Sequence, residues 1–244
     1  MKGFGEYVIF LGSLVVRRES FKTYYRLTIE ECVQIGVKSI SLVALVATFI
    51  GAVTTVQTAY NMVAPYIPKY IIAQVVREMA ILELAPTIMA IIYAGKVGSS
   101  MAGGLGTMRI TEQIDALEVM GINSASYLVL PKIIASILMY PLLVIIAGAC
   151  ALLGGYIVGS VANIVTPEDF VYGLRYSFDS YAITFALIKS VVFAFLISSI
   201  SSFKGYFTQG GALEVGIATT ATVTGSIIAV LASDYLLAQL LYVR

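Results

Sequence analysis

The side chains of this chain that could do chemistry are a few charged residues set in long apolar stretches. Glu83 is flanked by the apolar strings MAIL and LAPTIMAII, and Lys189 lies about seven residues into another apolar run. An ammonium group there costs at least about 2.5 kcal/mol, so it must reach the surface, pair with a carboxylate or face a wet cavity. Glu83 and Lys189 are therefore either residues of a functional cavity or partners in a structural pair. Arg77 and Glu78 are expected to be structural.

A short charged helix stands between two long apolar runs, at residues 111–120. We expect Thr111 to be its N-cap, Glu112 to lie at the positive end of its dipole and Gly121 to end it. The helix is about 15 Å long and too short to cross a membrane, so it should lie at the water interface. Its apolar and acidic faces are formed by Ile110, Ile114 and Leu117 and by Glu112, Asp115 and Glu118, respectively. Such a helix either joins two spans or docks on a soluble partner.

Composition excludes several kinds of chemistry. The chain has no histidine, the commonest general base and transition-metal ligand, so we expect no catalytic set and no metal site. Cys32 and Cys150 belong to no CxxC pair and are expected as small core residues. The glycine-rich stretch around Lys96 fails the phosphate-loop pattern, because Ala90 and Val97 stand where glycine and serine or threonine are required. We therefore expect no ATP site and no cofactor in this chain.

The elements that must position these residues are membrane helices. Of the 244 residues, 59% are hydrophobic and 12% are charged, and the mean hydropathy is +0.93. The net charge of +1, with scattered basic residues, makes a nucleic-acid partner unexpected. The apolar runs predict an all-α membrane protein with about five spans, at about 36–60, 70–108, 127–162, 182–203 and 213–240. Pro86 and several glycines interrupt the second span, which must tilt, bend or break.

Residues 1–30 are expected to form an amphipathic interfacial segment of one or two helices, ahead of a single polytopic membrane domain at 31–244. Apolar residues recur there at helical spacing, at Phe4, Val8, Leu11 and Val15. Lysine and arginine are concentrated near the amino terminus and in the loops expected on the same side. The positive-inside rule therefore places the amino terminus and the 111–120 helix in the cytoplasm.

Two ordered motifs carry a family resemblance. Between Glu83 and Lys132 the chain reads ELAP, AGKVG, LGTMRITEQIDALEVMG and YLVLPK, and residues 204–222 read KGYFTQGGALEVGIATTAT. These strings resemble the MlaE family of ABC-transporter permeases, which belong to lipid transport systems built with MCE-domain proteins.

The resemblance implies a homodimeric permease of the bacterial inner membrane that serves outer-membrane lipid asymmetry. Two cytoplasmic ATPase subunits would bind ATP and Mg²⁺, and a periplasmic MCE-domain protein would receive or deliver phospholipid. The residues that would couple the ATPase to the membrane are Glu112, Gln113, Asp115, Ala116 and Leu117.

The resemblance also identifies candidates for a lipid cavity. Lys189 and Asp234 match a lysine in the fourth span and an aspartate near the end of the fifth, and Glu83 belongs to ELAP. Gly104 stands where family members usually carry an acidic residue, and Leu82 stands where arginine is common. The candidates are thus Glu83, Gly104, Lys189 and Asp234.

Two other classes remain open from the residues alone. A gradient-driven secondary transporter would have related halves with paired broken helices, and no such repeat is visible. A noncatalytic membrane assembly subunit would need only the hydropathy pattern.

Overall fold

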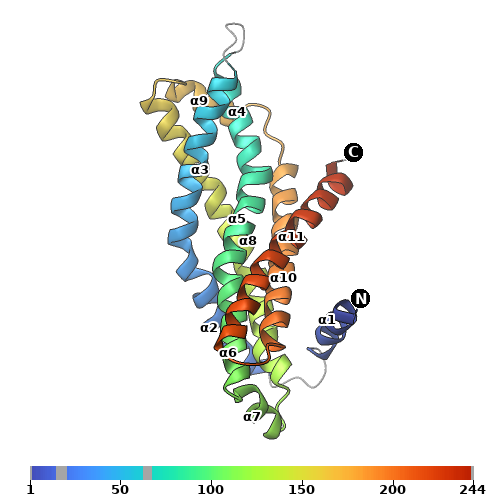
Figure 1. Ribbon diagram of the computed structural model, residues 1–244. Helices are drawn as coiled ribbons and strands as arrows, with labels where there is room; N and C mark the ends of the chain where they lie inside the picture. Colours follow the sequence, from blue (N-terminus) through green and yellow to red (C-terminus); the bar gives the residue numbers. More distant parts are fainter. Residues whose placement is uncertain (1, 15–20, 63–67, 243–244) are drawn as a thin grey trace. The chain divides into compact units, whose positions relative to one another are not determined.

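The computed structural model describes residues 2–14, 21–62 and 68–242, and every element in this part of the chain is helical (Figure 1). The elements are α1 Lys2–Ser13, α2 Phe21–Ile35, η1 Val37–Ser39, α3 Ile40–Asn61, α4 Tyr70–Met79, η2 Ala80–Ile88, α5 Met89–Tyr93, η3 Ala94–Gly98, α6 Ser99–Ile110, α7 Gln113–Val119, α8 Ser124–Val161, α9 Pro167–Arg175, α10 Tyr181–Tyr206 and α11 Ala212–Tyr242. The all-α prediction is confirmed.

Four helical stretches are long and apolar enough to cross a membrane: Lys22–Asn61, Ser124–Val161, Tyr181–Tyr206 and Ala212–Leu240. The chain is thus a multi-pass membrane protein. The expected second span, 70–108, is helical along its length but is divided into shorter elements, from α4 to α6. The count of five spans stays a prediction.

Two π-helical segments divide this second run, η2 around Pro86 and η3 between Ala94 and Gly98. Proline has no N–H to donate and its ring collides with the carbonyl four residues earlier, so the α register cannot continue through it. A π turn absorbs the extra residue without ending the helix. The break expected at Pro86 is therefore a change of helical register.

The described chain packs as two compact units that alternate along the sequence. One unit comprises residues 39–89 and 141–190, and the other comprises 1–38, 90–140 and 191–244, apart from the residues outside the described ranges. In the first unit, Gly51 of α3 lies against Ala151 of α8, and Gly154 of α8 lies against Thr48. A β-carbon at either glycine would strike the facing backbone, so these small residues let the two helices approach closely.

Helix α9 packs on α4, where Phe170 and Val165 join a buried cluster with Ala73 and Val76. Its start is well marked: the Thr166 hydroxyl accepts from the Asp169 N–H, and Pro167 occupies the first helical position. The sequence Thr-Pro-Glu-Asp at residues 166–169 is a recognisable helix start, although the apolar runs alone predict no helix between the third and fourth spans.

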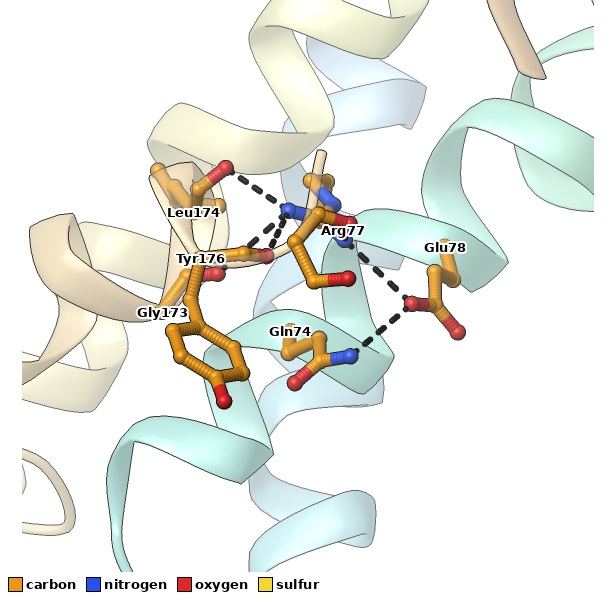
Figure 2. A network of polar contacts seen from close by, with 7 residues as sticks. Gln74, Arg77, Glu78, Gly173, Leu174 and Tyr176 are labelled. Carbon is orange, nitrogen blue, oxygen red and sulfur yellow. Dashed lines mark hydrogen bonds and ion pairs between the residues drawn. The ribbon is translucent and has the colours of Figure 1, made fainter. Parts of the chain in front are cut away.

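Arg77 of α4 ties the end of α9 to this unit (Figure 2). Its side chain is buried, and Nη1 donates to the carbonyls of Leu174 and Tyr176, both at 2.9 Å. Weaker contacts reach the carbonyls of Gly173 and Ser177. The last carbonyls of a helix lack internal partners, and a charged donor satisfies several of them at once. The structural role expected of Arg77 is what the structure shows.

Helix α7 has different ends from those expected. Thr111 closes α6 instead of capping α7, because its N–H and its hydroxyl both donate to the Thr107 carbonyl. Glu112 occupies the N-cap position with a left-handed backbone, φ 59°. Ile110 accordingly lies in α6, not on the apolar face of α7. The prediction of Thr111 as N-cap is wrong, because the chain reverses one residue later.

The predicted stop at Gly121 is confirmed. Its φ is +78°, its N–H donates to the Glu118 carbonyl at 2.9 Å, and the Ile122 N–H donates to the Leu117 carbonyl at 3.1 Å. These two bonds form a Schellman motif, in which the left-handed residue is normally glycine.

Arg77→Met should lower the free energy of unfolding by about 2–3 kcal/mol, because the charged donor to several carbonyls is lost. Denaturant titration of the detergent-solubilised protein measures this change. Arg26→Met is the control: its pair with Glu30 is exposed, so its effect should stay within about 0.5 kcal/mol. Equal effects of the two substitutions would contradict the role of Arg77.

Gly121→Ala should lower the free energy of unfolding by about 1 kcal/mol, since an alanine must adopt left-handed φ there. The space around Gly121 is open, so the cost is one of backbone conformation alone. Gly104→Ala is the matched control, because Gly104 is also open but lies inside α6, where alanine favours the helix. A stability loss at both positions would contradict the turn assignment.

Candidate functional site

Helix α7 presents most of its surface to solvent and anchors itself by one apolar side chain. Ile114 is fully buried and belongs to a cluster with Leu105 of α6 and Val129 of α8. Of the five predicted coupling residues, Leu117 is half-buried and the others are exposed, namely Glu112, Gln113, Asp115 and Ala116. The helix, which follows α6 and precedes α8 in Figure 1, therefore has a free polar face and a fixed apolar one.

An ion pair braces α7 against the preceding helix. The Arg109 guanidinium donates to the Asp115 carboxylate at 2.7 Å, and its carbon lies 6.0 Å from the ring centre of Tyr206. Both partners are partly exposed, so the pair contributes orientation more than stability.

A triangle of hydrogen-bonding oxygens joins α7 to α8 and α10; we call Glu118, Ser124 and Tyr206 the Glu118 triad. The Ser124 hydroxyl donates to Glu118 Oε1 at 2.8 Å, and the Tyr206 hydroxyl donates to the same atom at 3.0 Å. The Ser124 and Tyr206 oxygens lie 2.7 Å apart. Ser124 and Tyr206 are buried, whereas Glu118 is exposed.

The first residues of α8 also hold the end of α1. Asn123 accepts from the Ser126 N–H through Oδ1, as an N-cap does, and its amide nitrogen donates to the Ser13 carbonyl. The Ser126 hydroxyl donates to the Leu14 carbonyl at 3.0 Å, so the nearby Tyr24 hydroxyl must be the donor to Ser126.

One face of α1 packs on this same region. Phe10 is buried against the rings of Phe203, Tyr206 and Phe207. Tyr7 shares a hydrogen bond of 2.7 Å with Ser199 of α10. Burial raises the pKa of the Tyr7 hydroxyl above its ordinary value, so the phenol stays protonated. Of the apolar residues expected along the interfacial segment, Val8 is exposed and Leu11 is half-buried, while Phe4 and Val15 lie outside the described side chains. Its interfacial location stays a prediction.

A cleft of about 1140 Å³ opens between α1, the stretch from Glu118 to Ala125 and the end of α10. Arg109, Lys204 and Glu6 also line it, so its charges are mixed. The Glu118 triad lies along this cleft.

In the other unit, Glu83 and Lys189 form an ion pair with a distance of 2.9 Å between Nζ and Oε1. The Lys189 side chain has no exposed surface, whereas that of Glu83 is 53% exposed. Thr87 donates to the second carboxylate oxygen. The sequence left two roles open for these residues, a functional cavity or a structural pair. The ion pair is present, and the Glu83 carboxylate also faces outward.

Lys189 has a further partner that explains its burial. Nζ donates to the Leu82 carbonyl at 3.1 Å and lies 5.0 Å from the ring centre of Phe185. Leu82 lies in the π-helical segment η2, so the buried ammonium is held by a backbone carbonyl of this segment as well as by the Glu83 carboxylate.

The other two lipid-cavity candidates belong to the unit that holds α7. Gly104 is exposed on α6, with open space where a β-carbon would stand. Asp234 on α11 is half-buried, with Oδ1 shielded from solvent. Their role stays a prediction.

Sequence reasoning missed the residues that attach α7 and α1, above all Ser124, Tyr206 and Phe10. The sequence predicts Glu118 only as part of the acidic face of the 111–120 helix. The string Asn123-Ser124-Ala125-Ser126 before an apolar run is a helix start that would have identified the cap. Nothing in the spacing relates Glu118 to Tyr206, 88 residues away.

The chain matches known permeases over most of its length. The family described as Permease MlaE matches residues 28–240. A probable ABC transporter permease protein of Rickettsia bellii is 37% identical over 219 residues, covering 90% of this chain and 84% of the relative. A protein with the same description from Synechocystis is 34% identical, covering 89% and 82%. The chloroplastic protein TRIGALACTOSYLDIACYLGLYCEROL 1 of Arabidopsis thaliana is 33% identical, covering 96% and 67%. With its helical spans and exposed α7, the chain therefore belongs to the MlaE permease family and is a membrane permease of the ABC type.

Proposed function

We propose that this protein is the permease subunit of an ATP-driven transporter that moves phospholipid between the inner membrane and an MCE-protein conduit to the outer membrane. The observation that carries the proposal is α7: a short helix with an exposed polar face, fixed by Ile114 and joined to α8 and α10 by the Glu118 triad. A soluble ATPase that grips this face can move the membrane helices. The Arabidopsis relative is named for a glycolipid, which supports a lipid cargo.

The assembly follows from this role. Two copies of the chain would pair in the bacterial inner membrane, with the amino terminus and α7 in the cytoplasm. Two ATPase subunits would bind ATP and Mg²⁺ and contact Glu112, Gln113, Asp115, Ala116 and Leu117. The MCE-domain protein would dock on the periplasmic face and maintain outer-membrane lipid asymmetry with the permease.

Glu83 is the candidate for contact with the cargo. Its carboxylate is half-exposed, while Lys189 is buried behind it and fixes one oxygen. In our proposal Glu83 lines the lipid path, Lys189 holds its orientation, and Gly104 and Asp234 line the path farther along the chain. A charged group in such a path binds complementary headgroup charge.

The function is tested by lipid transfer from proteoliposomes that contain the permease, with or without its ABC ATPase and ATP. We expect transfer only with both present. Transfer without the ATPase that follows a proton gradient would show a secondary transporter instead. The absence of transfer with the full complex would indicate an assembly subunit.

Ala116→Arg should abolish binding of the ATPase and reduce ATP-dependent transfer by at least about tenfold, equivalent to ~1.4 kcal/mol. Ala116 is exposed on α7, so a long cation there obstructs docking without disturbing the fold. Co-purification of the ATPase and the transfer assay measure both effects. Glu30→Arg, an exposed change on α2 outside the expected contact, is the control. ATPase binding by Ala116→Arg equal to that of the control would remove α7 as the docking element.

Glu83→Gln should lower lipid transfer by about tenfold, and the double variant Glu83→Gln/Lys189→Met should not restore it. The double variant removes both charges together. Transfer should recover in it if Glu83 serves only to neutralise Lys189, and should stay low if Glu83 contacts the cargo. Thermal unfolding of each variant shows whether it remains folded. Recovery of parent transfer in the double variant would make the pair purely structural.

A further inference from the structure

We infer that the Glu118 triad, held in place by α1, is the connection through which movement of α7 is passed to α10. This inference rests on the proposed function, since it names the residues by which ATPase motion enters the membrane helices. Glu118, Ser124 and Tyr206 are positioning residues, because each would act through its contacts with the others.

Helix α7 is built to move as a short rigid body. It has seven residues, and both of its ends are turns with a left-handed residue, Glu112 at φ 59° and Gly121 at φ +78°. Because the chain reverses at both turns, a displacement of α7 can be absorbed there instead of being carried along the backbone into α6 and α8. Side-chain contacts must then transmit it, and Glu118 contacts both α8 and α10.

The triad holds three oxygens with two protons. Glu118 is an acceptor, and the hydroxyls of Ser124 and Tyr206 each have one proton to donate. Two of the three close contacts can therefore be hydrogen bonds at one time, and Tyr206 can donate either to Glu118 or to Ser124. Its hydroxyl can exchange one acceptor for the other, so the link between α7 and α10 can shift without leaving the phenol unpaired.

Helix α1 keeps Tyr206 from rotating freely. The Tyr206 ring lies 5.3 Å from the centre of Phe10 and 5.2 Å from that of Phe207. Phe10 is only 3% exposed, and the end of α1 is held at the Ser13 and Leu14 carbonyls. With the ring held in this way, a pull on the hydroxyl is passed to the end of α10.

Tyr206→Phe tests the connection because it removes one oxygen and keeps the ring. In proteoliposomes with the ATPase and ATP, we expect lipid moved per ATP hydrolysed to fall at least fivefold, with ATPase binding and hydrolysis retained. Tyr7→Phe is the matched control: it also removes a phenol–serine hydrogen bond to α10, but its partner Ser199 is not joined to α7. Glu118→Gln keeps an accepting oxygen and should retain most of the coupling, whereas Glu118→Leu should lose it.

Hydrogen exchange gives a readout that does not depend on the cargo. On addition of the ATPase and ATP, amide exchange in α7 and in residues 198–206 should change in the parent protein. Tyr206→Phe should keep the change in α7 and lose it in 198–206. Glu118→Leu, at an exposed position, provides the same test should Tyr206→Phe fail to fold.

Equal transfer per ATP in Tyr206→Phe, Tyr7→Phe and the parent would overturn the inference. So would a loss of transfer that simply follows a loss of ATPase binding, since that shows a docking defect. If the parent itself moves no lipid with ATP, the proposed function fails, and the exchange experiment still decides whether Tyr206 connects α7 to α10.

Discussion

Buried cations that need oxygen partners among apolar helices determine much of this fold. Lys189 lies fully buried in an apolar run, and its ammonium donates to the Glu83 carboxylate and to the Leu82 carbonyl. The end of α9 leaves carbonyls without internal partners, and Arg77 donates to them. In both cases a buried cation that would be costly alone is stabilised by the oxygens that surround it. These contacts join segments of the chain that lie about 100 residues apart in the sequence.

The same constraint explains how the amino-terminal helix is attached. The final carbonyls of α1 are bound by Asn123 and Ser126, the residues that begin α8. Residues at the start of α8 therefore donate hydrogen bonds to carbonyls at the end of α1. This arrangement places α1 beside the Glu118 triad, which joins α7 to α8 and α10. The other face of α1 can contact lipid in addition.

How far the sequence predicts this structure depends on how local each signal is. The apolar runs and Gly121 were readable, because helix formation and the left-handed stop depend on neighbouring residues. Thr111 misled because a good capping residue can equally close the preceding helix. The bond from Tyr206 to Glu118 and the carbonyls bound by Arg77 could not be predicted, since these partners lie about 90 to 100 residues away and their chemistry, a hydroxyl or a carbonyl, is present everywhere in the chain.

Arg77 holds the end of α9 and the loop that follows through backbone carbonyls, which every amino acid possesses (Figure 2), and its guanidinium also lies 5.4 Å from the ring centre of Phe178. The hydrogen bonds themselves place no demand on the side chains of the residues whose carbonyls accept them. Gly173 must nevertheless lack a side chain, because any β-carbon there would collide with the Tyr70 carbonyl. The side chains at 174 and 176 are constrained separately, because Leu174 packs against the cluster around Phe170 and the Tyr176 ring lies 5.2 Å from that of Tyr70. This segment is therefore held twice, once by its backbone and once by its side chains.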